Sequence, residues 1–204
     1  MQYIEFRKSF QNYILFSKKD IEKRWPKFNK MNLIYWQKKD YIYKIRNSWY
    51  CFSDIIDNEK VNLFIANKIY NPSYISRETA LHYYGFIPEG VFLTTSVSTL
   101  KTKEFNTFLG IFSYNTIKSS CFFAYTLIKI DNITIRMAEP EKALLDFLYF
   151  KKSIYTIDDI KSYRFNKDAI KEIVDFEKIE AYVAMFKTKV LREKLNLLKQ
   201  YVNA

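Results

Sequence analysis

The chain has 204 residues, of which 49% are hydrophobic, and it contains 17 Tyr and 18 Phe. This much apolar and aromatic material excludes an intrinsically disordered protein. A chain of this length fits one or two domains and can bury most of its apolar surface.

The formal net charge is +11, and most of it lies near the N-terminus. Residues 1–53 hold 12 Lys and Arg against 4 Asp and Glu, whereas residues 54–204 hold 21 against 18. This asymmetry favours an anionic partner at the N-terminal end, with nucleic acid ahead of a membrane surface. The alternative is a lysine-rich composition that reflects the genome rather than a ligand.

Several classes of protein are disfavoured by what the sequence lacks. No apolar run approaches the roughly 20 residues of a transmembrane helix, and the opening MQYIEFRKSF has an acidic residue and no small-residue cleavage site. Cys51 and Cys121 are far apart, and His82 is the sole histidine. We therefore expect a cytoplasmic protein with free thiols and with no metal, cofactor or membrane contact.

Two short helices are predicted before residue 26. In IEFRKSFQNY, the residues that fall roughly on one helical face are Ile4, Phe6, Phe10 and Tyr13. A second helix, KKDIEKRW, follows Ser17, which can act as its N-cap, and Asp20 three residues later completes a capping box.

A third helix and a β-hairpin are predicted next. Pro26 is expected to open the helix PKFNKMNLIYWQKK, with Leu33 and Trp36 facing inward. The strand-like runs YIYKI and WYCF are joined by Arg46-Asn47-Ser48, which predicts a hairpin. Three short helices followed by a hairpin is the order of a winged helix-turn-helix, so residues 1–53 are interpreted as a DNA-binding domain.

The winged-helix interpretation assigns candidate DNA contacts. The third helix enters the major groove, where Asn can pair with adenine and Lys can meet guanine or phosphate. Free N–H groups at the start of the second helix attract phosphate. The candidates are Lys27, Asn29, Lys30, Asn32 and Lys38 on the third helix, Lys44, Arg46 and Asn47 in the wing, and Ser17, Lys18 and Lys19 at the second helix. A merely solvated lysine face is the alternative.

A short linker, residues 54–60, precedes a helix VNLFIANKIY and the stretch NPSYISRETALHYYGFIPEG. Pro72 is expected to hold the following residues extended, and Ser76 to cap a helix over Arg77–Tyr84. Gly85 can then take the left-handed C′ conformation, and Pro88 prevents continuation.

The remaining chain predicts an α+β domain over residues 60–204, rich in strands over 91–138 and helical over 140–204. EPEKALLDFLYF is a helix with Pro140 at N1. An apolar stripe runs through the last helices, with core packing as its main interpretation and a dimer seam as the alternative: Ile170, Val174, Ile179, Val183, Phe186, Val190, Leu191, Leu195 and Leu198.

No catalytic motif is present: there is no Gly-rich phosphate loop, no GxSxG and no HExxH. Glu139, Glu141 and Asp146 are close in sequence and could bind Mg²⁺ in an enzyme acting on nucleic acid. Glu141 and Asp146 do not share one helical face, so structural roles and no enzymatic activity are expected.

Two segments, NPSYISRETALHYYGFIPEG and MAEPEKALLDFLYF, together with the Thr-rich TTSVST, resemble the AbiEi family. This family provides the antitoxins of type IV (abortive infection) toxin–antitoxin systems. The matching motif residues are Pro72, Ser73, Tyr74, Ser76, Gly85, Pro88, Glu89, Pro140, Glu141 and Lys142. The likeness is good over about residues 60–150 and looser in the C-terminal helices. At the wing turn, where the family often has Arg-Gly, this chain has Arg46-Asn47-Ser48.

The resemblance implies two activities. The winged helix would bind inverted repeats in the operator of its own operon, as a homodimer or otherwise. The α+β domain would neutralise a nucleotidyltransferase-like toxin without needing a stable complex. The alternative is a plain transcriptional regulator whose second domain senses a ligand or dimerises, with no toxin partner.

Overall fold

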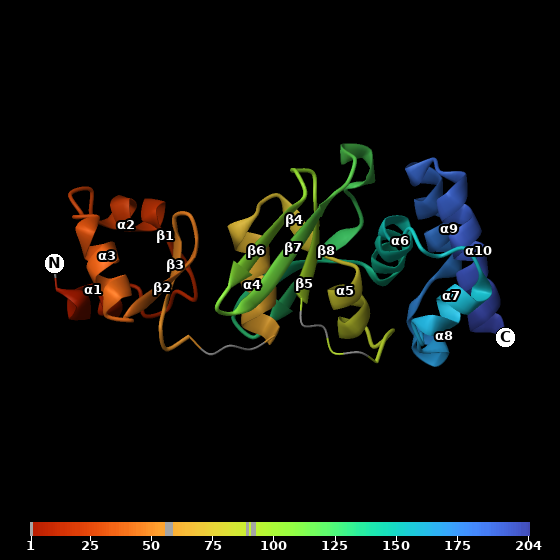
Figure 1. Cartoon of the computed structure of the whole chain (residues 1–204), viewed down its shortest axis with the longest axis horizontal. Coiled ribbons are helices and arrows are strands. Elements are labelled where there is room, and N and C mark those ends of the chain that lie inside the picture. Colours follow the sequence, from red (N-terminus) through yellow and green to blue (C-terminus); the bar gives the residue numbers. More distant parts are fainter. Residues whose placement is uncertain (1, 56–58, 89, 91–92) are drawn as a thin grey trace.

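The computed structural model describes residues 2–55, 59–88, 90 and 93–204. These residues form an elongated molecule with three successive parts: a small N-terminal unit, a central β-sheet flanked by helices, and a set of C-terminal helices (Figure 1). The two termini lie at opposite ends of the long axis. The expected α+β composition is confirmed.

The N-terminal unit, residues 2–55, alternates helices with a small sheet. Its elements are α1 (Tyr3–Ser9), β1 (Phe16–Ser17), α2 (Lys18–Arg24), α3 (Met31–Lys38), β2 (Ile42–Arg46) and β3 (Trp49–Phe52). The three strands pair antiparallel in the order β1-β3-β2. The hairpin is confirmed, whereas β1 has only two residues and was not predicted.

Local signals explain most of these boundaries. The Ser17–Asp20 capping box is confirmed, with both reciprocal hydrogen bonds present. The expectation that Pro26 opens the third helix was wrong: α3 begins at Met31, and its N-cap is Lys30. The five preceding residues form a turn because the Phe28 N–H bonds to the Trp25 carbonyl at 3.0 Å, and the Asn29 side chain accepts from the Met31 N–H at 3.0 Å.

An aromatic core holds the unit together. Its buried members are Phe6, Phe10, Phe16, Ile21, Leu33, Trp36, Ile42, Tyr50 and Phe52. The predicted inward positions of Leu33 and Trp36 are confirmed. The expected face of the first helix was only half right. Phe6 and Phe10 are buried, but Ile4 is 65% exposed. Tyr13, which is 47% exposed, lies beyond the end of α1 at Ser9.

Within the described residues, six strands make the central sheet. They are β4 (Ser73–Ile75), β5 (Leu93–Ser98), β6 (Lys103–Thr107), β7 (Gly110–Thr116), β8 (Tyr125–Ile130) and β9 (Ile133–Ala138), in the spatial order β6-β7-β5-β4-β9-β8. The pairs β4/β9 and β5/β7 are parallel, and the others are antiparallel. This sheet holds the main core of the protein.

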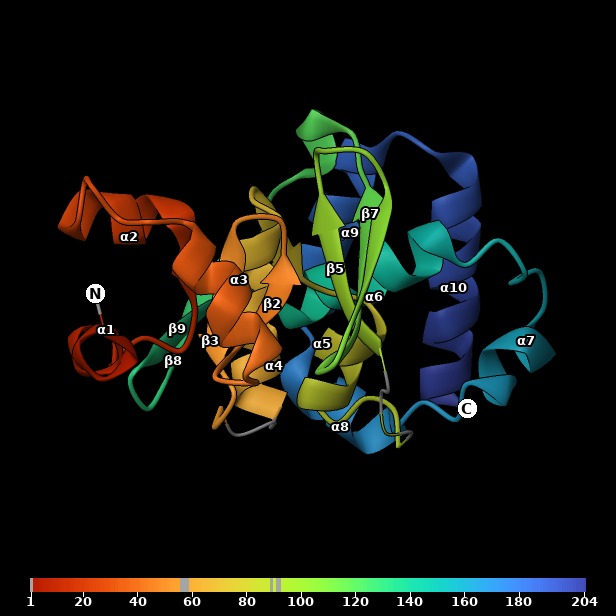
Figure 2. The ribbon, with the colours of Figure 1, turned by 60° about the vertical axis from the view of Figure 1, so that its left-hand side comes forward.

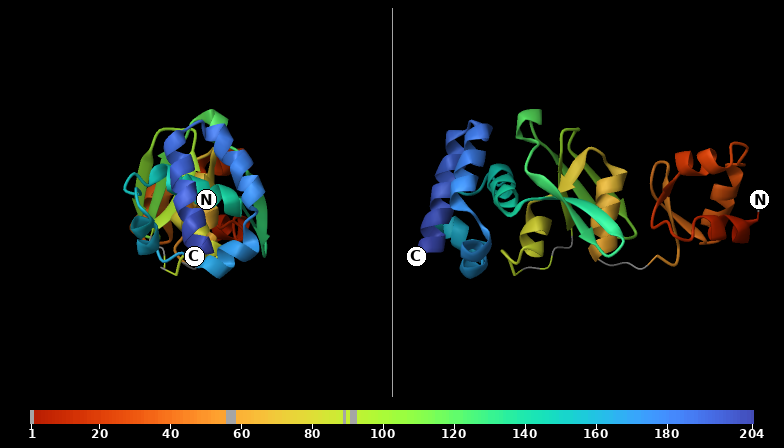
Figure 3. Two further views of the ribbon diagram at one scale, coloured as in Figure 1. Left: turned by 90° about the vertical axis from the view of Figure 1, so that its right-hand side faces the viewer. Right: turned by 180° about the vertical axis from the view of Figure 1, so that it is seen from behind.

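Helices cover both faces of the sheet. Helix α4 (Glu59–Ile69) lies on the face toward the N-terminal unit, where the Tyr114 hydroxyl donates to the Ala66 carbonyl at 2.8 Å. Helices α5 (Glu78–Tyr83) and α6 (Pro140–Phe150) lie on the opposite side, and α6 separates the sheet from the C-terminal helices (Figures 1 and 3). Pro140 at the first turn of α6 is as expected.

The stretch around residues 72–88 differs from its prediction at the helix start. Ser76 does not cap α5, because its hydroxyl donates to Asp146; Arg77 is the N-cap residue, with a φ of 60°. Gly85 takes the expected left-handed conformation, with φ +70°. Glu89 and three residues of the predicted linker (56–58) lie outside the described residues.

The C-terminal part contains α7 (Ile157–Ser162), α8 (Lys167–Ile173), α9 (Phe176–Phe186) and α10 (Lys189–Asn203). A 3₁₀ turn, η1 (Ser119–Cys121), lies earlier in the chain, between β7 and β8. Side chains of Thr156, Asn166, Asp175 and Thr188 accept hydrogen bonds from the first turns of these helices. The predicted apolar stripe is buried within the chain except for Val190, which is 58% exposed. Core packing therefore accounts for it.

The hairpin docks the N-terminal unit on the rest of the chain. Arg46 donates to the Ile69 carbonyl and lies over the rings of Tyr70 (5.0 Å) and Phe105 (4.4 Å). The Tyr43 ring lies 4.4 Å from Phe108 of the β6–β7 turn. The buried residues of the N-terminal unit that join the main core are Leu15, Ile45 and Cys51.

Candidate nucleic-acid interface

The outer face of α3 is exposed and unusual for a solvated helix. Met31 is 62% exposed, Ile34 48% and Tyr35 53%, although all three are apolar or aromatic. Lys38 is exposed on the same helix, whose opposite side buries the core residues. Apolar side chains beside cations suit a DNA groove, where they can contact thymine methyl groups while lysine meets phosphate. Figure 2 shows α3 at the front of the molecule, with the hairpin beside it.

The residues predicted on the third helix divide between the helix and the turn before it. Lys27, Asn29 and Lys30 lie in the turn, and Asn32 and Lys38 lie on α3. Lys30 forms an exposed ion pair with Glu22 of α2 at 2.8 Å, and the hydrogen bond with this carboxylate raises the pKa of Lys30. The turn therefore presents cations and amides at the N-terminal end of α3.

The start of α2 offers less to a phosphate than expected. The Ser17 hydroxyl donates to the Asp20 carboxylate at 2.7 Å, and the side chain is buried. The Lys18 backbone N–H donates to the Ser48 carbonyl at 2.9 Å. The capping box thus uses the Ser17 side chain and places a carboxylate at this end of the helix. The remaining candidates for a phosphate contact are the exposed Lys19 and the half-buried Lys18.

The hairpin brings two of its three predicted residues to the surface. Lys44 and Asn47 are exposed, whereas Arg46 is held against the sheet domain by the contacts described above. Arg46 therefore positions the hairpin and is not free to contact a ligand. Ser48, with φ 69°, supplies the left-handed position of the turn.

Sequence reasoning missed the exposed apolar residues of α3 and the aromatic turn before it. Once Leu33 and Trp36 are placed inward, helical geometry puts Met31, Ile34 and Tyr35 on the opposite face, since positions 31, 34 and 35 are spaced i, i+3 and i+4. The helical period therefore carried the signal for this exposed face.

A second group of predicted residues, the motif residues of the sheet domain, converges on a buried polar cluster. Lys142 and Asp146 of α6 form an ion pair with both side chains fully buried. Asp146 also accepts from the Tyr74 hydroxyl at 3.0 Å and the Ser76 hydroxyl at 2.8 Å, while Lys142 donates to the Tyr74 oxygen at 2.8 Å. The two sequence motifs, far apart in the chain, are thus joined by one hydrogen-bond network.

Burial shapes the protonation of this cluster. Desolvation lowers the pKa of Lys142, and Asp146 opposes that shift. Desolvation also raises the pKa of Tyr74 well above its ordinary value, helped by the neighbouring Asp146. The Lys142 side chain lies against aromatic rings, with its Nζ 5.3 Å from the ring centroid of Phe123 and 5.1 Å from that of Phe186. A cluster this enclosed is suited to holding α6 against the sheet and not to binding a ligand.

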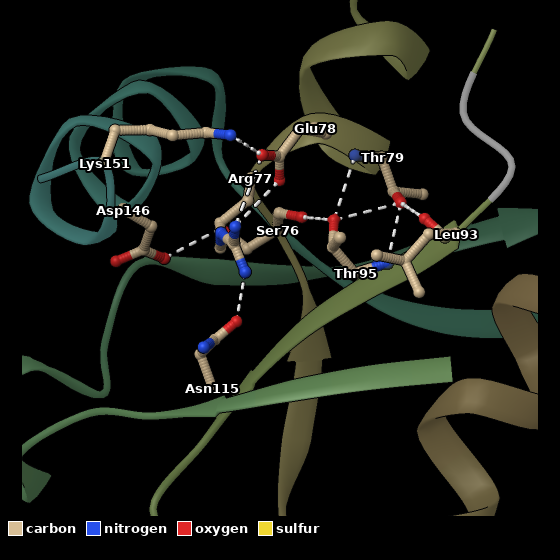
Figure 4. Close-up of polar contacts among 9 residues, drawn as sticks. All are labelled: Ser76, Arg77, Glu78, Thr79, Leu93, Thr95, Asn115, Asp146 and Lys151. Carbon is tan, nitrogen blue, oxygen red and sulfur yellow. Dashed lines mark hydrogen bonds and ion pairs between the residues drawn. The ribbon is translucent and has the colours of Figure 1, made fainter. Parts of the chain in front are cut away.

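A partly exposed polar network adjoins the buried cluster (Figure 4). Arg77 donates to Asn115 and pairs with Glu78 at 3.2 Å, and Lys151 pairs with Glu78 at 2.8 Å. Burial alone would raise the pKa of Glu78, but the charges of Arg77 and Lys151 outweigh burial and lower it. These contacts fix the backbone of Arg77 in its positive-φ conformation.

The motif residues not yet placed lie before, within and after the β4–α5 segment. Ser73 is buried in β4, and Pro72 follows a cis peptide bond just before that strand. Pro88 ends the segment after Gly85 and is exposed. Each lies where the chain changes direction around α5.

Of the carboxylates considered for Mg²⁺, Glu139 and Glu141 meet at the Lys178 ammonium, at 3.0 and 3.3 Å, and Asp146 lies apart from them. Asp146 belongs to the buried cluster; Glu141 accepts from the Asp175 N–H at 3.0 Å; Glu139 accepts from the Tyr182 hydroxyl at 2.7 Å and pairs with Lys178 at 3.0 Å. Among the residues that the structure describes, no group of three or more His, Cys, Asp or Glu is arranged to hold a metal ion. The two neighbouring carboxylates, Glu139 and Glu141, are paired with a lysine side chain.

The described helices include none that is both long and apolar enough to cross a bilayer. No protein-family model matches the chain, and no curated protein matches it significantly.

Proposed function

We propose that this protein is a DNA-binding transcriptional autoregulator whose sheet domain acts as an antitoxin of the AbiEi type, in the cytoplasm. The observation that supports DNA binding best is the N-terminal unit itself. Its order α1-β1-α2-α3-β2-β3, with a three-stranded sheet β1-β3-β2, is consistent with a winged helix, and this supports the proposal. Its recognition helix would be α3.

In this proposal α3 lies in the major groove. Asn32 reads base edges, while Met31 and Ile34 contact thymine methyl groups. Lys27, Lys38 and Lys44 contact phosphates and set the register of the protein on the duplex. An operator with inverted repeats would bind two chains.

The antitoxin role rests on the resemblance of the sheet domain to the AbiEi family. It is supported by the convergence of the motif residues Tyr74, Ser76 and Lys142 on a single network. This network explains why such residues recur together: they define the fold of the domain. The partner would be a nucleotidyltransferase-like toxin encoded beside this gene.

DNA binding is tested with charge-matched variants of the full chain. Lys27, Lys38 and Lys44 changed together to Gln should weaken binding to the DNA preceding the gene by at least tenfold, measured by fluorescence anisotropy. The control changes Lys152, Lys171 and Arg192 to Gln, all exposed in the C-terminal part, and should bind as the parent does. Equal losses in both variants would show that only net charge matters and would contradict the proposed interface.

The antitoxin role is tested by growth of cells that express the neighbouring gene. The full chain carrying the three α3 and hairpin substitutions is preferable to a fragment, because cutting off the N-terminal unit would leave the partners of Leu15, Ile45 and Cys51 uncovered. Rescue by this variant supports an antitoxin domain that acts without DNA binding. A neighbour that is harmless by itself would instead favour the plain regulator with a sensing or dimerisation domain.

A further inference from the structure

An aromatic pocket opens at the turn between α2 and α3. It has a volume of about 460 Å³ and is lined by Arg24, Trp25, Pro26, Lys27, Phe28, Asn29 and Asn32. The pocket lies beside the N-terminal end of α3, which is the part of a recognition helix that comes closest to base edges. None of the roles assigned above uses its aromatic rings.

The two rings of the pocket are held in place from behind. Trp25 lies 5.8 Å from Phe6 and 5.8 Å from Phe10, and Phe28 lies 5.8 Å from Trp36, measured between ring centroids. Both rings therefore pack against the buried core and remain partly exposed. The Arg24 guanidinium lies over the Trp25 ring, 5.6 Å from its centroid, whereas, among the described residues, no cation is placed over Phe28. A partly exposed ring that packs on a core is a stacking platform, because it loses little conformational freedom when a flat ligand binds.

The rim has the chemistry that a nucleotide requires. Arg24 and Lys27 carry positive charge, and the lining residues include no carboxylate. The Asn29 side-chain oxygen accepts a hydrogen bond from the Met31 N–H, and its amide N–H₂ can donate to a ligand. Asn32, half-buried on the first turn of α3, adds a second amide able to pair with a base edge.

An aliphatic side chain of a protein partner would fill the apolar floor but would not use the cations. A phosphate alone would use the cations but not the rings. A nucleobase on its sugar-phosphate uses both, because its flat face stacks on the aromatic rings while its phosphate meets Arg24 or Lys27.

We propose that this pocket receives a single unstacked nucleobase of the bound DNA. The inference rests on the proposed DNA-binding function and adds to it a site for a base that leaves the stack. Extruding a base is least costly where the base is already unpaired. The protein should therefore prefer DNA that presents an unpaired base over the same duplex fully paired.

The test uses the full chain and two duplexes of one sequence, one with a single unpaired 2-aminopurine and one with that base paired. We expect roughly tenfold tighter binding of the unpaired form, together with a change in 2-aminopurine fluorescence on stacking. Phe28→Leu keeps an apolar side chain but removes a stacking face, and should bring the affinity ratio close to one. Thermal unfolding of the variant checks that its core is intact.

Tyr35→Leu is the matched control, since Tyr35 lies on the exposed face of α3 outside the pocket. It should leave the affinity ratio unchanged even if it weakens binding to both duplexes. Asn32→Ala, a second pocket variant, should lower the ratio without removing core material.

Three outcomes would overturn the inference. An affinity ratio near one in the parent protein, with DNA still bound, rejects the pocket but not the DNA-binding function. A ratio that survives both pocket variants places the unpaired base elsewhere. Free deoxyadenosine monophosphate that competes at the concentration of the DNA strand would make the pocket a nucleotide sensor. Absence of binding to either duplex would instead reject the proposed function.

Discussion

The buried pair Lys142–Asp146 allows a quantitative prediction for Asp146→Asn. The substitution keeps the size of the side chain and an oxygen that can accept from the Tyr74 and Ser76 hydroxyls. It removes the negative charge that compensates Lys142, whose side chain is fully buried. The effect therefore isolates the ion pair from the packing.

The expected loss is about 3–5 kcal/mol of unfolding free energy, the usual result of removing one partner from a buried ion pair. For a domain whose total stability is on the order of 5–15 kcal/mol, such a loss is large. Lys142 can deprotonate in the variant, since burial already lowers its pKa, and this limits the loss at high pH. Urea unfolding at neutral pH and again near pH 9 measures both effects.

The control is Glu193→Gln, which breaks the pair Lys189–Glu193 at the same i,i+4 spacing on α10, where both side chains are exposed. This change should leave the unfolding free energy nearly unchanged. The double variant Lys142→Met, Asp146→Asn should recover much of the loss, because no unpaired charge then remains buried while the Asn oxygen still accepts from the Tyr74 and Ser76 hydroxyls. A cost below about 1 kcal/mol for Asp146→Asn would refute the view that this pair organises the domain.

Three further predictions concern single positions. The pKa of Glu78 lies below its ordinary 4.5 because the charges of Arg77 and Lys151 outweigh its burial. The contribution of Glu78 to stability is therefore complete above pH 4.5 and is lost as the pH falls through the lowered pKa. Glu78→Gln should flatten the acid side of the curve of stability against pH, and an unchanged curve would contradict the pairing. Gly85→Ala should cost about 1 kcal/mol in urea unfolding, since the residue has φ +70° while an added Cβ would meet nothing within 4 Å; a neutral effect would mean that the turn relaxes. Arg46→Ala should increase amide exchange in the β2–β3 hairpin without unfolding the sheet domain, because it removes the contacts with Ile69, Tyr70 and Phe105; unchanged exchange would show that other contacts dock the hairpin.

Several elements were predictable because their signals are local. The Ser17–Asp20 capping box, the left-handed Gly85 and the start of α6 at Pro140 each depend on a few neighbouring residues. The inward positions of Leu33 and Trp36 follow from helical periodicity. The sequence therefore predicts the three helices and the hairpin of the N-terminal unit in their observed order, but not strand β1.

Other features depend on residues far apart in the chain. Ser76 has the chemistry of an N-cap, but Asp146, seventy residues later, takes its hydroxyl, and the helix begins after Arg77 instead. Arg46 has the sequence position of a wing-tip contact, but the sheet domain offers it a carbonyl and two aromatic rings. A single sequence shows neither partner, because nothing local specifies which distant elements pack together.

Pro26 shows a different limit. Proline is favoured in the first turn of a helix, but it is equally suited to a turn. Here the Asn29 side chain accepts from the Met31 N–H two residues later, which stabilises a turn before α3 begins at Met31. As a consequence, residues 25–29 line the aromatic pocket instead of forming a helical turn.

The central claim is that the N-terminal unit binds DNA through α3 and the hairpin. A salt titration of full-chain binding to the DNA that precedes its gene tests this claim most directly. With about five phosphates contacted per chain, log K should fall with log salt at a slope of roughly −4 to −5. The variant with Lys27, Lys38 and Lys44 changed to Gln should show a slope shallower by about 2 to 3. A slope near zero in the parent protein, or an identical slope in the variant, would contradict the account.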